Sequence, residues 1–138
     1  MEGSSRQPDH GRRLLTHVID ERARNGHHRP YASIPISKNA EDGFRDVSYP
    51  TFANAINRCA LWLNAGVGHS TRFEKLAYMG PNDLRYPILC IAANKIGYVV
   101  SRVSSQRYRS VADSIADVLS FPEEQLGCAH VVVRRKRH

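Results

Sequence analysis

The clearest pattern in the chain is an apolar stripe at helical spacing near its middle. Pro50 lies where a helix can begin, because its missing N–H is not needed in the first turn. Gly66 and Gly68 mark the expected end. The pattern therefore predicts a long helix with one apolar side. The residues on that side are Phe52, Ala53, Ile56, Cys59, Ala60 and Leu63, and Trp62 flanks them.

A strand, a helix and a second strand are predicted next. Phe73 to Met79 carries an apolar run typical of a strand, and Gly80-Pro81-Asn82 is a turn, where Asn82 can cap the following helix. Apolar residues from Leu84 to Ala92 predict that helix, which ends near Gly97. Tyr98 to Val100 begins the second strand. This βαβ order implies a parallel sheet with a right-handed crossover.

Shorter elements are predicted before the long helix. An apolar stripe predicts a first helix from Gly11 to Asn25, with Gly26 as its stop. Residues 31–37 and 44–49 alternate between two sides, and the turn at 39–43 separates them. Together they predict a hairpin, in which Pro35 confines its strand to an edge.

The composition changes after Val100. Residues 101–110 read SRVSSQRYRS, and residues 111–121 resume a helical spacing. Residues 129–133 form a short apolar run typical of a strand. The chain ends in Arg134-Arg135-Lys136-Arg137-His138, so part of its positive charge is concentrated there.

Length and charge narrow the class of protein. The chain has 138 residues and a net charge of +7, and 41% of its residues are hydrophobic. This is enough for one compact domain or a piece of a larger one, and too short for a complete two-domain enzyme. No stretch approaches the roughly 18 apolar residues of a membrane span, and the polar N-terminus does not suggest a secretory signal. We therefore expect a cytoplasmic protein.

Residues able to carry chemistry are scattered. Cys59, Cys90 and Cys128 form no Cys-x-x-Cys pair, and we expect Cys59 and Cys90 to be small core residues on helices. The adjacent pair His27-His28 lacks a third ligand nearby, so a metal site is not expected. We predict no catalytic, cofactor-binding or metal-ligating residue. The other candidates, considered and set aside as structural or solvated, are His17, Asp20-Glu21 and Glu123-Glu124.

Four stretches, in order, resemble a known superfamily. They are GRRLLTHVIDERAR at 11–24, RPYASIP at 29–35, DGFRDVSYPTFANAINRCALWL at 42–63 and FEKLAYMGPNDLRYPILCIAANKIGY at 73–98. Together they resemble the start of an adenylation domain of the AMP-forming acyl/aryl-acid ligase superfamily. Within it, the chain is similar to fungal adenylate-forming reductases that resemble nonribosomal peptide synthetases.

The resemblance implies an α/β fold: a partial N-terminal subdomain with a βαβ unit, preceded by a helix and a hairpin. It divides the chain into a loose N-terminus (1–10), a partial AMP-binding domain (11–100) and a divergent basic tail (101–138). Complete relatives activate a carboxylic acid with ATP. ATP and Mg²⁺, with phosphopantetheine and NADPH in further domains, are implied for those complete relatives and not for this chain.

The departure from the family is as informative as the match. The pattern is lost after Tyr98, and the loop that cradles ATP phosphates is not reached. Residues 66–71, GVGHST, have two glycines but no lysine before Ser70-Thr71, which favours a helix-terminal turn over a phosphate loop. We therefore expect a truncated fragment, inactive alone. A frameshift or retained intron, a real truncated product and a divergent functional ending all remain open for the tail.

Two other functions are compatible with the sequence. A fragment that exposes its sheet edge could be an interaction module docking on another protein chain. The basic residues 134–137 could bind nucleic acid weakly and without sequence specificity, although no recognition fold accompanies them. No membrane partner is expected.

Overall fold

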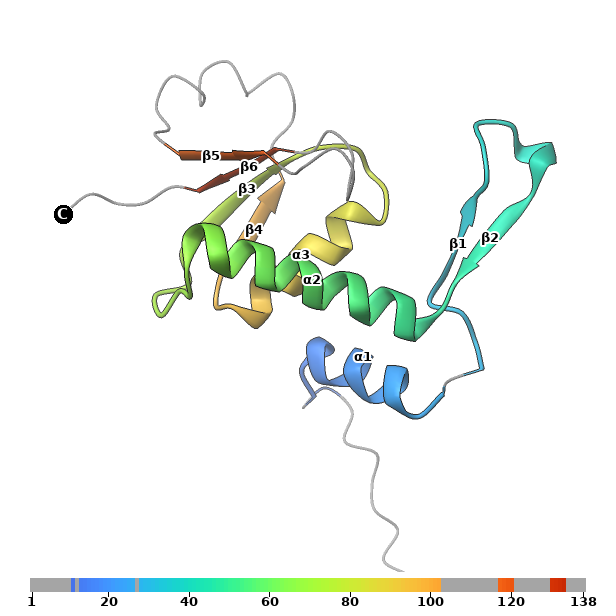
Figure 1. The fold of residues 1–138 in the computed structure, drawn as a ribbon, viewed down its shortest axis with the longest axis horizontal. Helices are drawn as coiled ribbons and strands as arrows, with labels where there is room; N and C mark the ends of the chain where they lie inside the picture. Colours follow the sequence, from blue (N-terminus) through green and yellow to red (C-terminus); the bar gives the residue numbers. More distant parts are fainter. Residues whose placement is uncertain (1–10, 12, 27, 103–116, 121–129, 134–138) are drawn as a thin grey trace, which may run out of the picture. The chain divides into compact units, whose positions relative to one another are not determined.

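The computed structural model describes residues 11, 13–26, 28–102, 117–120 and 130–133. The chain divides into two units, Met1–Thr51 and Phe52–His138, each described by itself below. Helices and strands are mixed, as the α/β prediction requires (Figure 1). Among the described residues, no helix combines the length and hydropathy that crossing a membrane would need.

The first unit contains a short helix and a hairpin. Helix α1 (Leu15–Arg24) begins four residues later than predicted, because Gly11 lies in the left-handed region at φ 80° and Leu14 has an extended backbone with ψ 138°. Gly26, at φ 62°, follows the helix as predicted.

The predicted hairpin is confirmed in the same unit. Strands β1 (Ala32–Pro35) and β2 (Phe44–Val47) pair antiparallel, from Ala32 opposite Val47 to Pro35 opposite Phe44. The short 3₁₀ helix η1 (Ala40–Asp42) forms the turn between them. Since the sheet has two strands, both are edges, and Pro35 is tolerated there.

Helix α2 (Tyr49–Val67) is the predicted long helix, and its first three residues are counted with the first unit. Ser48 lies directly before it, and its Oγ accepts a hydrogen bond from the Thr51 N–H at 3.2 Å. A serine that bonds a first-turn amide is a helix N-cap, so the local sequence explains the start. The predicted apolar side is buried from Phe52 to Leu63.

The predicted βαβ unit is confirmed in the second unit. Strand β3 (Lys75–Met79) is followed by helix α3 (Arg85–Lys95) and by strand β4 (Val99–Arg102), which pairs with β3 in parallel. The helix buries residues on most of its sides, as a nearly continuous apolar run predicts. Its buried residues are Ile88, Leu89, Ile91, Ala92 and Ala93.

Two further strands complete the sheet. Strands β5 (Asp117–Ser120) and β6 (His130–Val133) pair antiparallel, and β6 also pairs antiparallel with β3. The order is β4-β3-β6-β5, so β3 has a neighbour on each side (Figure 1). The outer strands of this sheet are β4 and β5.

One predicted element is corrected. The spacing of residues 111–121 predicts a helix, but residues 117–120 form β5. A short apolar run is compatible with either a helix or a strand, so its weak helical periodicity does not decide the structure. Here the residues form a strand because they pair with β6. The rest of that stretch lies outside the described residues. The strand predicted at 129–133 is confirmed as β6.

The core of the second unit is formed by α2, β3 and α3. Leu76 and Tyr78 of β3 are both 0% exposed, while Ala77 between them is half-buried. This alternation is typical of a strand whose one face packs against helices. Lys95 Nζ donates to Asn57 Oδ1 at 2.8 Å, which joins α3 to α2 at the surface of this core.

Gly97 makes the close approach that joins the α3–β4 turn to the loop after α2. Its φ is 83°, and a Cβ there would collide with the carbonyl oxygen of Ser70. The Ser70 N–H donates to the Ile96 carbonyl oxygen at 2.9 Å, which holds the two segments together. Gly68 has a similar φ of 76°, but open space surrounds it.

We predict that Gly97→Ala destabilises the protein much more than Gly68→Ala. Both variants place a side chain at a left-handed φ, which costs about 1–2 kcal/mol, whereas only Gly97→Ala adds a collision with backbone that costs a further ~1–3 kcal/mol. Denaturant unfolding of both variants measures the difference. Equal losses would show that the contact with Ser70 is absent.

Candidate functional site

The two-glycine segment 66–71 is a structural turn. Gly66 and Val67 belong to the last turn of α2, and the Gly68 N–H donates to the Asn64 carbonyl oxygen at 2.9 Å. This confirms the helix-terminal turn that the sequence favours over a phosphate loop.

Ser70 is the one polar residue among the buried residues described, with 4% of its surface exposed. Its Oγ accepts hydrogen bonds from the N–H groups of Arg72 at 3.4 Å and Glu74 at 3.2 Å. Its own N–H is bonded to Ile96, so both its backbone donor and its side chain are engaged within the fold. These bonds shape the entry into β3.

A group of interacting polar side chains lies at the carboxyl ends of β3 and β4. We call it the carboxyl-edge cluster and define it by six residues. In parallel sheets this edge is where ligands commonly bind, so its chemistry decides what the fold can do. The residues are Tyr78, Asn82, Asp83, Arg85, Tyr86 and Arg102.

Asp83 and Arg85 pair at the start of α3. The Arg85 Nε lies 2.9 Å and 3.0 Å from the two carboxylate oxygens, and the Arg85 backbone N–H donates to Asp83 Oδ1 at 3.0 Å. The hydrogen bonds from Arg85 lower the pKa of Asp83, with burial opposing them. The prediction that Asn82 caps this helix is wrong: Asp83 bonds the first helical N–H instead, because its carboxylate is also held by the arginine.

Asn82 has a different role. Its Oδ1 accepts a hydrogen bond from Arg102 Nη1 at 3.3 Å, which joins the turn after β3 to the end of β4. The Arg102 guanidinium also lies 6.0 Å from the centre of the Tyr86 ring, within the range of a cation–π interaction. These contacts tie Arg102 to both the turn and α3.

Two tyrosines complete the cluster. The Tyr78 hydroxyl donates to the Pro81 carbonyl oxygen at 3.0 Å, and its ring centre lies 5.4 Å from that of Tyr86. Burial, followed by the charge of Asp83, raises the pKa of Tyr78. A Cβ at Gly80 would collide with the Tyr78 hydroxyl, so a larger residue in this turn would displace the tyrosine ring. The cluster therefore holds the β3–α3 turn in shape.

Of the two cysteines predicted to be core residues on helices, Cys59 lies in the core, whereas Cys90 lies on α3 and is only half-buried. Cys59 is 4% exposed, and burial raises its pKa to about 12. Cys90 is half-buried, and burial also raises its pKa, although a hydrogen bond with Tyr86 opposes the shift. A thiol whose pKa is raised is mostly protonated at neutral pH, which makes it a poor nucleophile. Cys128 lies outside the described residues.

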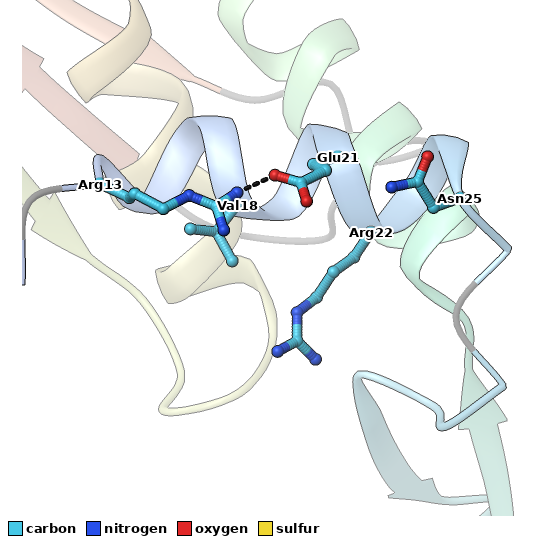
Figure 2. Close-up of a pocket in the computed structure, with 5 residues that line it drawn as sticks. All are labelled: Arg13, Val18, Glu21, Arg22 and Asn25. Atoms are coloured by element: carbon cyan, nitrogen blue, oxygen red, sulfur yellow. Dashed lines mark hydrogen bonds and ion pairs between the residues drawn. The ribbon is translucent and has the colours of Figure 1, made fainter. Parts of the chain in front are cut away.

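A small pocket lies along α1 and the residues that flank it (Figure 2). Its volume is about 250 Å³. Arg13 and Glu21, which point toward one another in Figure 2, form an ion pair across it. Arg22 lies with its guanidinium 5.5 Å from the Tyr49 ring centre. The remaining lining residues are Val18 and Asn25, so the pocket has no nucleophile or metal-ligating set.

The other candidates set aside by sequence reasoning behave as follows. His17 and Glu21 are exposed and Asp20 is half-buried on α1. His28 is exposed, while its neighbour His27 and the pair Glu123-Glu124 lie outside the described residues. Within the described part of the chain, no three His, Cys, Asp or Glu side chains come close enough together to hold a metal ion.

Sequence reasoning did not single out the carboxyl-edge cluster. A signal for it was present, because a predicted βαβ unit places the ends of its two strands at the same edge. That rule brings Tyr78 and Arg102 together although they are far apart in sequence. The exact partners of Arg102 could not be predicted, since they depend on side-chain conformations in the turn.

Two of the known proteins that are similar to this chain illustrate its relationships. A carboxylic acid reductase from Neurospora crassa is 38% identical over 101 residues, which are 72% of this chain and 10% of that protein. The isocyanide synthase-NRPS hybrid crmA from Aspergillus fumigatus is 37% identical over 89 residues, which are 64% of this chain and 6% of that protein. The chain thus corresponds to a small part of the length of each relative.

These matches confirm the resemblance to fungal reductases and to proteins with nonribosomal peptide synthetase parts. No family model matches the chain. No solved structure matches it either.

We predict that Asp83 contributes to stability in a pH-dependent way. Since its pKa is lowered in the folded state from the ordinary 3.8, its contribution is present above that value and is lost as the pH falls through the lowered pKa. Wild-type protein should therefore lose more stability than Asp83→Asn between pH 6 and strongly acidic solution. Unfolding midpoints across that range measure this, and parallel curves for the two proteins would contradict it.

Proposed function

From its similarity to a fungal carboxylic acid reductase and an NRPS hybrid, we propose that this chain forms part of the N-terminal subdomain of an AMP-forming adenylation domain. Its role there is that of a structural framework. The observation that carries the proposal is the β3–α3–β4 unit that follows α2, within the portion of sequence that resembles such domains. Its buried side chains are apolar and its polar side chains mainly pair with each other. Those are the properties of a framework, and the chemistry belongs to other parts of such an enzyme.

The two-glycine segment 66–71 lacks the features of a cradle for the phosphates of ATP. A phosphate cradle needs backbone N–H groups directed at the ligand, commonly with a lysine beside them. In the two-glycine segment, the N–H groups of Gly68 and Ser70 are both bonded to carbonyl oxygens of the fold. Activation of a carboxylic acid by this chain alone is therefore not part of the proposal.

The carboxyl-edge cluster supports the same function. Its charged groups are matched in pairs or engaged with the turn, as in Asp83 with Arg85 and Arg102 with Asn82. A general base or nucleophile would need a group that can take or give a proton near neutral pH. The lowered pKa of Asp83 and the raised pKa of Tyr78 both move away from that range.

A chimera tests the scaffold role. The stretch of the Neurospora crassa reductase that matches this chain is replaced by this chain's own residues. Because the stretch supplies framework only, we expect acid-dependent ATP–pyrophosphate exchange to be kept within about tenfold of the parent, a change of about 1.4 kcal/mol in the barrier. The matched control is the same chimera carrying Leu76→Asp, which places a charge in the buried core and should abolish folding and exchange together.

Two outcomes would contradict the proposal. One is a chimera that is folded, as judged by its unfolding transition, but has lost exchange by several orders of magnitude. The other is acid-dependent pyrophosphate release by the purified 138-residue protein itself.

A further inference from the structure

Strand β6 lies between β3 and β5, at the side of β3 that β4 does not cover. Its four residues pair with β3 from Met79 opposite His130 to Leu76 opposite Val133. The same four residues pair with β5 on their other side. The strand contains the run Val131-Val132-Val133, and β-branched residues favour strands.

Without β6, β3 would present an open edge. Its sequence KLAYM has two fully buried side chains, Leu76 and Tyr78, and carries a charge only at its first residue. Open edges with an apolar pattern and few charges are templates for pairing with another chain. Every copy of the protein would carry the same edge, so the nearest available partner is a second copy.

The outer strand β4 is protected in another way. It has four residues and ends in the exposed Arg102, which is held by Asn82 and lies near Tyr86. Short strands and charged side chains discourage edge-to-edge pairing. Strand β4 is thus protected by its own short length and charged end. Strand β3 lacks this protection and depends on a neighbouring strand to cover its edge.

We propose that β6 is an intramolecular cap, which occupies β3 and prevents a second copy of this chain from pairing with it. Strand β6 then has a definite role in this protein, although its sequence lies beyond the part of the chain that resembles the adenylation domains. The proposal concerns self-association and is independent of the proposed scaffold function.

A pair of introduced cysteines tests the position of the cap in the intact chain. Ala77 and Val132 are directly opposite in the register, so Ala77→Cys with Val132→Cys is expected to form a disulfide under mild oxidation. The matched control is Ala77→Cys with Val133→Cys, because successive residues of a strand alternate between faces. Mass mapping of the crosslinked peptides distinguishes these links from links to native cysteines.

We expect the 77–132 link to form at least about tenfold faster than the 77–133 link, because only directly opposite positions satisfy disulfide geometry. Equal rates, or no link in either variant, would overturn the cap.

A second variant tests the consequence for self-association. Val132→Pro removes an N–H from a strand that is paired on both sides and should release β6 from β3. Light scattering after size exclusion is expected to show a dimer or larger species, whereas Val132→Thr and the oxidised 77–132 protein remain monomeric. A folded Val132→Pro protein that stays monomeric at the same concentration would overturn the proposal. If that variant does not fold, the crosslinking result decides.

Discussion

The pairing of β3 on both sides is the constraint on which the larger unit depends. Strand β3 pairs in parallel with β4 through the α3 crossover and antiparallel with β6 from the end of the chain. Its Leu76 and Tyr78 are completely buried, in a core to which α2 and α3 also contribute. Five residues thus bring together segments from the middle and the end of the sequence.

Polar groups in this unit serve the same architecture. The Ser70 N–H donates to the Ile96 carbonyl oxygen, and the Ser70 Oγ accepts hydrogen bonds from the N–H groups of Arg72 and Glu74 in the loop that enters β3. Tyr78 binds the carbonyl oxygen of Pro81 in the turn that leaves β3, and Gly80 leaves room for its ring. Asp83 and Arg85 fix the start of α3. Since these groups bind one another, the unit gains a defined shape, which supports the proposed role as a framework.

Much of this architecture could be predicted from local patterns. The apolar side of α2, the alternation in the hairpin and the order strand–helix–strand each depend on residues that are close in sequence. These predictions were confirmed. The prediction of the residue that caps α3 was wrong. Asn82 and Asp83 are both residue types that cap helices, and the position of Arg85 decides between them. The strand at 117–120 was missed because its partner β6 is distant in sequence, and its own spacing is compatible with a helix. To predict the carboxyl-edge cluster, both the parallel pairing of β3 with β4 and the side-chain conformations must be known. The sequence predicts only the pairing.

Amide hydrogen exchange, followed residue by residue in the intact protein, tests most directly whether β3 organises the larger unit. Residues 75–79 lie between two strands and include the fully buried Leu76 and Tyr78, whereas β1 and β2 form a two-stranded sheet. When a buried strand has a neighbour on each side, its amide hydrogen bonds break only when the whole unit unfolds. The hydrogen bonds of a two-stranded hairpin can break by local opening. The account predicts that the hydrogen-bonded amides of β3 exchange at the slowest rate in the chain, together with those of α3. Exchange of the β3 amides as fast as those of the β1–β2 hairpin would contradict it.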